Sequence, residues 1–66
     1  MARWVECAAR YPERRVVLVN LEAALLIVPE EEGSLIVFPG GKETWLRVVE
    51  SPADVLSKRP LENDDA

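Results

Sequence analysis

Few side chains in this chain could carry out chemistry. The chain has no histidine and a single cysteine, Cys7, so it lacks the residue that most often serves as general base near neutral pH. Cys7 stands between Glu6 and Ala8, without a neighbouring cation to stabilise its thiolate. We therefore expect Cys7 to be a buried, inert thiol, and we expect the protein not to be an enzyme.

Two short motifs invite a ligand-binding interpretation, and we favour a structural one for both. Glu30-Glu31-Glu32 could hold a metal ion, but consecutive residues of a turn point in different directions, so a solvated acidic turn fits better. Gly40-Gly41-Lys42 lacks the following Ser or Thr and the helix start of a phosphate-binding loop, and paired glycines are typical of a tight turn. One cysteine without histidine also argues against structural zinc. The sequence thus predicts no metal and no cofactor.

Two tryptophans and one arginine are candidates for an interaction surface. Arg47 stands between Trp45 and Val49 in an expected strand, where its aliphatic stem could cover apolar surface. Trp4 opens another expected strand near the start of the chain. Aromatic residues and arginine contribute much of the binding energy at protein interfaces, so these three side chains are the first candidates for contact with a partner.

The chain also carries a local basic cluster of Arg10, Arg14 and Arg15 in a nearly neutral body. The net charge is −4, of which the last five residues carry −3, so residues 1–59 have a net charge of −1 from 8 basic and 9 acidic residues. Such totals do not indicate the basic surface that drives nucleic-acid binding. The cluster nevertheless leaves one alternative open, a nucleic-acid-associated regulator that uses these arginines.

Apolar runs rich in β-branched residues predict a sheet. Turn signals divide the runs: a charged stretch around Pro12, the acidic turn before Gly33 and the glycine pair before Lys42. In the runs 16–19 and 35–38 both faces of a strand would be apolar, whereas a half-exposed strand should alternate. The expected strands cover residues 3–9, 15–19, about 24–28, 35–38 and 44–50.

The segment 21–28 has two interpretations. Its first half contains good helix formers, and Asn20 could cap one or two helical turns. Its second half ends in the β-branched pair Ile27-Val28 followed by Pro29, which favours a strand that stops at the proline. We favour a strand from about Ala24 and leave a preceding helical turn open.

A short helix is predicted after the last strand. Ser51 is suited to the N-cap, Pro52 to the first helical position and Asp54 to the first turn, where each residue type stabilises a helix start. Val55 and Leu56 would pack inward, and the next proline would end the helix.

The sequence therefore predicts a mainly β protein (α+β), a small curved antiparallel sheet of four to five strands with one C-terminal helix. Residues 1–59 would form a single small β-rich domain, and residues 60–66 an acidic disordered tail. A chain this small buries only about 60% of its unfolded surface, and one cysteine excludes an intrachain disulfide, so self-association is the expected source of further stability. No stretch reaches the ~20 apolar residues of a membrane span, no secretory signal follows Met1, and we expect a cytoplasmic location.

From Asn20 onward the chain shows an ordered pattern: an apolar strand, an acidic turn with proline, a strand ending in Gly-Lys and a close into a helix. The residues that carry it, over 20–56, are Asn20-Leu21, Ile27, Pro29-Glu30, Leu35, Gly41-Lys42, Val49-Glu50-Ser51 and Asp54-Val55. This pattern resembles that of the small flagellar FlbD-type proteins, also called swarming motility proteins, although the start, Trp4-Val5-Glu6-Cys7, differs from the family's. The resemblance implies a small, non-enzymatic bacterial accessory protein and supplies no catalytic residues.

We therefore expect a small non-catalytic protein, a protein–protein interaction module or accessory subunit that forms a homodimer or larger homo-oligomer. Its partner surface would be the apolar sheet face that one copy cannot cover. The candidate surface residues are Trp4, Trp45, Arg47, Arg10, Arg14 and Arg15.

Overall fold

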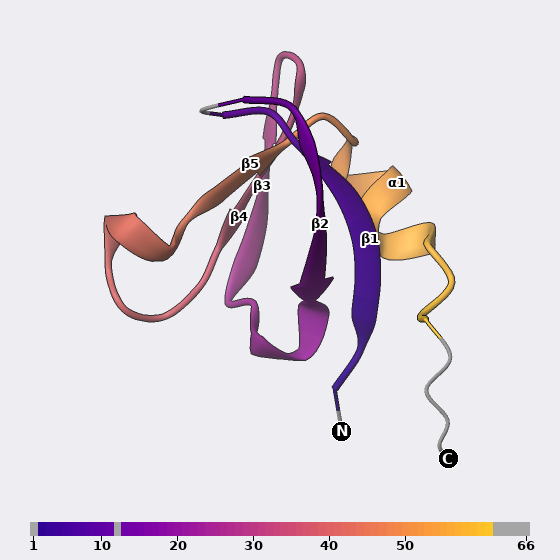
Figure 1. Cartoon of the computed structure of the whole chain (residues 1–66). Coiled ribbons are helices and arrows are strands. Elements are labelled where there is room, and N and C mark those ends of the chain that lie inside the picture. The colour runs from indigo at the N-terminus through magenta and orange to yellow at the C-terminus, as the bar shows by residue number, and fades with distance from the viewer. Residues whose placement is uncertain (1, 12, 62–66) are drawn as a thin grey trace.

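The computed structural model describes residues 2–11 and 13–61. Within these residues the chain forms strands, two 3-10 turns and one short α-helix (Figure 1). The strands are β1 (Trp4–Ala9), β2 (Arg15–Asn20), β3 (Leu26–Glu30), β4 (Gly33–Val37) and β5 (Leu46–Val48). The 3-10 turns are η1 (Leu21–Ala23) and η2 (Lys42–Thr44), and the helix is α1 (Pro52–Ser57).

The strands form one antiparallel sheet in the order β2-β1-β5-β4-β3. β1 with β2 and β3 with β4 are hairpins, and β5 joins the two hairpins in the middle of the sheet. The chain passes directly from β2 to β3 through η1 (Figure 1), although these strands are the two edges. The sheet is therefore strongly curved, and the predicted mainly β fold with one C-terminal helix is confirmed.

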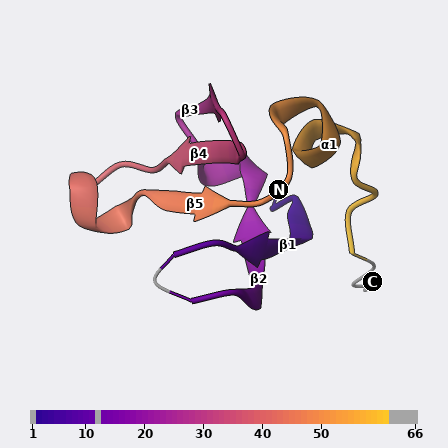
Figure 2. The same cartoon turned by 90° about the horizontal axis from the view of Figure 1, so that it is seen from above.

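The core lies on the inner face of this curved sheet. Alternate residues of β1 point inward, as the period of a strand requires, and Val5, Cys7 and Ala9 are at most 3% exposed. Helix α1 lies at the far end of the molecule from η2 (Figure 2) and contributes a fully buried side chain. The core cluster consists of Val5, Cys7, Val19, Ile36, Val48 and Val55.

The segment after β2 contains both elements that the sequence left open. Asn20 caps η1, and its Oδ1 accepts the backbone N–H of Glu22 at 3.0 Å. The helical turn is short because the chain joins the sheet again at once: the N–H of Leu25 donates to the carbonyl of Val37 at 2.8 Å. The strand that follows begins at Leu26, slightly later than expected.

The prediction that this strand stops at Pro29 is wrong, because β3 continues to Glu30. The main-chain groups of Arg47 and Val49 form hydrogen bonds with Arg10 and Ala8, on the β1 side of β5. The main-chain N–H and carbonyl of Val48, between them, therefore point towards β4. Ser34 is opposite Val48, so its main-chain groups point towards β5. Pro29 is opposite Ser34, so the main chain of Pro29 points towards the open edge of the sheet. The N–H that proline lacks would have had no strand partner there, so the residue is tolerated.

Helix α1 begins as predicted but packs differently. The Oγ of Ser51 accepts the N–H of Asp54 at 3.1 Å, which confirms the cap. Val55 is fully buried, whereas Leu56 is 57% exposed, so the prediction that Leu56 packs inward is wrong. Successive residues of a helix point about 100° apart, and a helix of six residues presents one side chain to this narrow core.

The last strand is shorter than predicted, because Thr44 belongs to η2. The Thr44 hydroxyl lies within hydrogen-bond distance of three preceding carbonyls, the nearest that of Gly41 at 2.8 Å. These contacts close the loop before β5 begins. Gly40 and Gly41 have φ values of 114° and 98°, which confirms that the glycine pair forms a turn.

Parts of two predicted segments lie outside the described residues. They are Pro12 in the first turn and residues 62–66 of the C-terminal tail. Over residues 2–11 and 13–61, no helix has the length and apolar character needed to cross a membrane.

Candidate functional site

Trp45 and Arg47 lie together on the outer face of β3, β4 and β5. Arg47 pairs with Leu35, and Leu35 with Val28. Trp45 immediately precedes β5 in extended backbone and lies two residues before Arg47, so strand alternation places the two side chains on the same face. We call this surface the Trp45 face, and it consists of Trp45, Arg47, Leu35, Val37, Leu26 and Val28.

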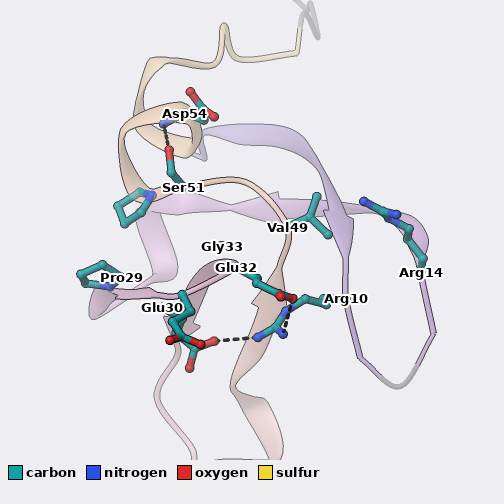
Figure 3. Close-up of a pocket in the computed structure, with 11 residues that line it drawn as sticks. Arg10, Arg14, Pro29, Glu30, Glu32, Gly33, Val49, Ser51 and Asp54 are labelled. Atoms are coloured by element: carbon teal, nitrogen blue, oxygen red, sulfur yellow. Dashed lines mark hydrogen bonds and ion pairs between the residues drawn. The ribbon is translucent and has the colours of Figure 1, made fainter.

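Glu30 connects two of the candidate arginines on this face. Its Oε1 lies 2.9 Å from the Nη2 of Arg10 and 3.4 Å from the Nε of Arg47, and Figure 3 shows the pair with Arg10. The two arginines are cross-strand neighbours, where like charges would repel. Strand β4 lies between Arg47 and Glu30, so this ion pair spans β4, whose Leu35 is opposite Arg47 and only 8% exposed.

The structure divides the basic cluster that the sequence indicated. Arg10 is bound to the acidic turn, and Arg15 lies 3.9 Å from Glu13 in an exposed pair that contributes little to stability. Arg14 makes no ion pair with any residue that the structure describes, and it lies apart from the Arg10 pair (Figure 3). Only Arg14 among the three thus presents an uncompensated charge within the described part of the chain.

Trp4 belongs to a different surface from Trp45. β1 meets β5 at the pair Ala9–Val48, and the two tryptophans lie on opposite sides of this pair along the strands. Trp4 shares the outer face of the β1–β2 hairpin with Val16 and Leu18, as the alternation of strand side chains requires. The two tryptophans therefore do not belong to one contact surface.

An apolar groove that the sequence did not indicate lies between the start of β3 and α1. It has a volume of about 360 Å³. Its lining is Leu21, Ala24, Leu25, Leu26, Ile27, Pro52 and Leu56. Among the residues that the structure describes, every side chain of this lining is apolar.

A larger pocket, of about 790 Å³, lies where the acidic turn approaches the start of α1 (Figure 3). Arg10, Arg14, Asp54 and the three glutamates line it together with Ser51. The Ser51 hydroxyl accepts the backbone N–H of Asp54 as the helix cap. Among the described residues, no group of three or more His, Cys, Asp or Glu could hold a metal ion.

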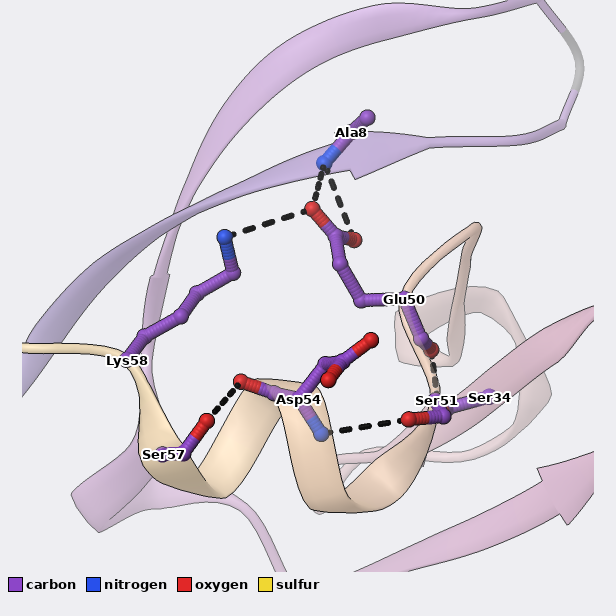
Figure 4. Close-up of polar contacts among 7 residues, drawn as sticks. All are labelled: Ala8, Ser34, Glu50, Ser51, Asp54, Ser57 and Lys58. Carbon is purple, nitrogen blue, oxygen red and sulfur yellow. Dashed lines mark hydrogen bonds and ion pairs between the residues drawn. The ribbon is translucent and has the colours of Figure 1, made fainter.

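Glu50 is a residue that the sequence reasoning missed, and it joins three parts of the fold (Figure 4). Its carboxylate accepts the N–H of Ala8 at 3.1 and 3.2 Å and lies 3.4 Å from the Nζ of Lys58. Its carbonyl accepts the Ser34 hydroxyl at 2.6 Å. The carboxylate therefore replaces the strand partner that Ala8 lacks, since β5 pairs with β1 at one position.

Cys7 is buried, as expected, at 2% exposure. Burial raises the pKa of its thiol above the ordinary 9.0, the charge of Glu50 raises the pKa further, and Lys58 opposes this shift. The folded protein therefore keeps the thiol proton at a pH where the unfolded chain releases it.

We expect this difference in pKa to reduce stability in alkaline solution. Below about pH 9 the protonated thiol makes its full contribution to the free energy of unfolding. As the pH rises from there towards the raised pKa, the free energy of unfolding falls by at most about 1.4 kcal/mol per pH unit. Urea unfolding of the wild type and of Cys7→Ala, from neutral to alkaline pH, measures this loss of stability. The difference in the free energy of unfolding should shrink above about pH 9, and a constant difference would contradict the assignment.

Comparisons with known proteins do not assign a family or a fold relative. No family model matches the chain, and neither the curated proteins nor the solved structures gave a match. The function must therefore be inferred from the residues and their geometry.

Proposed function

We propose that this protein is a small non-catalytic interaction module, an accessory subunit that self-associates. The observation that supports this proposal is the apolar surface that one copy leaves exposed. Five aliphatic side chains on β2, at the start of β3 and on α1 are more than half exposed. They are Val16 (64%), Leu18 (57%), Leu25 (65%), Leu26 (52%) and Leu56 (57%).

The arrangement of these side chains supports the proposal more than their number does. Single exposed apolar residues are common on any protein surface, but grouped ones are typical of interaction sites. Val16 and Leu18 lie on one face of an edge strand, next to Trp4. The exposed leucines near β3 surround the apolar groove. Both groups lie on parts of the fold that another chain could reach.

The geometry favours this module over a nucleic-acid-associated regulator. Phosphate binding needs several cations that are free to replace counterions. Arg10 is already bound by Glu30, and Arg15 lies beside Glu13. Arg14 would remain as the principal phosphate contact of the cluster, which is too little for strong binding.

The resemblance to FlbD-type proteins over residues 20–56 agrees with a non-enzymatic role. It implies an accessory protein and brings no catalytic residue to this chain. We therefore assign the chain to binding rather than to catalysis.

Light scattering coupled to size exclusion tests the proposal. We expect a molar mass above the 7.4 kDa of one chain at high concentration, with dissociation on dilution, because exposed apolar surface is covered by association. A stable monomer of 7.4 kDa at every concentration would contradict the proposal.

A further inference from the structure

The two edges of the sheet differ in how well they are protected. Exposed edge strands are templates for pairing with another chain, and proteins commonly protect them with proline, charge or a covering element. On β3, Pro29 faces the open edge and α1 packs nearby. Strand β2 carries a charge only at its first residue, Arg15, and has no proline and, within residues 2–11 and 13–61, no covering element. The less protected edge is therefore β2.

The main-chain groups of β2 show which residues are free to pair. The N–H and carbonyl of Ala8 bond to Glu50 and Val49, away from β2. Val16, opposite Ala8, must therefore direct its own N–H and carbonyl away from β1, and Leu18 does the same two residues later. No backbone hydrogen bond among the described residues uses these outward groups.

We propose that a second copy of this chain binds here, through antiparallel pairing of the two β2 strands across a two-fold axis at Val17. This inference rests on the proposed function and names its partner. In this register Val16 lies opposite Leu18 of the second copy, and Leu18 opposite its Val16. Each such pair exchanges two main-chain hydrogen bonds and places two exposed aliphatic side chains in contact on the outer face.

The same register brings opposite charges together. Glu6 lies opposite Leu18 on the outer face, and Arg14 immediately precedes β2. Neither makes an ion pair with any residue in the described ranges. In the dimer Arg14 of each copy lies opposite Asn20 of the other, within side-chain reach of its Glu6 and Trp4. Such contacts would be an ion pair and a cation–π contact.

The size of the contact predicts a reversible dimer. One pair of short strands with two aliphatic contacts covers less than the standard interface of about 1,600 Å². We expect dissociation in the micromolar range, so the dimer forms at high concentration and separates on dilution. The β2 edges are consumed by the pairing, which closes the assembly at two copies.

A matched pair of lysine substitutions locates the interface by light scattering. Leu18→Lys and Leu25→Lys change similarly exposed leucines, at 57% and 65% exposure, but only the first lies on β2. We expect Leu18→Lys to raise the dissociation constant at least ten-fold and Leu25→Lys to leave it within about two-fold, because a charged edge resists pairing. A wild-type oligomer that Leu18→Lys does not weaken would overturn this interface and leave the proposed function intact. A monomeric wild type would overturn both.

Cysteine pairing tests the register itself and does not depend on a loss of binding. A mixture of Val16→Cys and Leu18→Cys chains should form a disulfide-linked dimer, because directly opposite residues are about 5.5 Å apart at Cα, within disulfide range. Either variant alone should cross-link far less, since like positions are displaced along the strand. Cys7 is buried and should not interfere. Equal cross-linking in the single variants, or none in the mixture, would overturn the register.

Discussion

Replacing Gly33 with alanine should largely unfold the protein. The Cβ of an alanine at this position would lie 2.0 Å from the carbonyl oxygen of Val48 and 3.0 Å from two backbone atoms of Val49. Backbone cannot rotate away as a flexible side chain can, so β4 and β5 would have to separate. Gly33 also has a φ of 128°, a region that residues with a Cβ rarely adopt and that costs them about 1–3 kcal/mol.

The combined cost should be at least about 3 kcal/mol, from backbone strain and overpacking. That loss is comparable to the total that a core of this size supplies. Gly41→Ala is the matched control, because Gly41 also has a positive φ of 98° but its nearest contact is the flexible Glu43 carboxylate at 3.4 Å. Urea unfolding followed by tryptophan fluorescence compares the two. Equal midpoints for both variants would show that the close approach to Val48 does not matter.

The fold was predictable from the sequence where the signals are local. Apolar β-branched runs between turn signals identified the strands, and the Ser51–Pro52–Asp54 start identified the helix through contacts within one turn. Asn20 as a cap is of the same kind. In each case the residues that determine the structure are close together in the chain, so no knowledge of the sheet was needed.

The candidate site was less predictable, because it depends on the order of the strands. Arg10 and Arg47 become neighbours only because β5 is inserted beside β1. Glu30 then binds both from the far side of β4. The error at Pro29 has the same origin: a proline is compatible with a strand at an edge, and the sequence does not tell which strand is at the edge.

The two tryptophans show the same limit. Trp4 and Trp45 are alike in type and in exposure, at 39% and 38%, and both were assigned to one candidate surface. The register separates them, because Trp4 pairs with Asn20 of the edge strand β2, whereas Trp45 follows η2 and immediately precedes β5. The two tryptophans therefore belong to different parts of the molecular surface.

Replacing Glu50 with alanine should destabilise the protein more than any other single loss of a carboxylate. The variant removes both acceptors of the Ala8 N–H and leaves Lys58 without its partner. A buried donor left without an acceptor costs about 1–3 kcal/mol, and charged partners place the loss at the upper end. We expect about 2–3 kcal/mol in the free energy of unfolding, measured by urea titration.

Two matched variants separate the parts of this effect. Glu50→Gln keeps an oxygen acceptor for Ala8 and loses only the charge, so it should cost about 1 kcal/mol. Glu43→Ala removes an exposed carboxylate from η2 and should change stability by no more than about 0.5 kcal/mol. If Glu50→Ala lost no more stability than Glu43→Ala, the Glu50 carboxylate would not be needed where β1 and β5 do not pair. If the loss of stability is largest for Glu50→Ala, smaller for Glu50→Gln and smallest for Glu43→Ala, the Glu50 side chain stabilises the fold both as acceptor for Ala8 and through its charge beside Lys58.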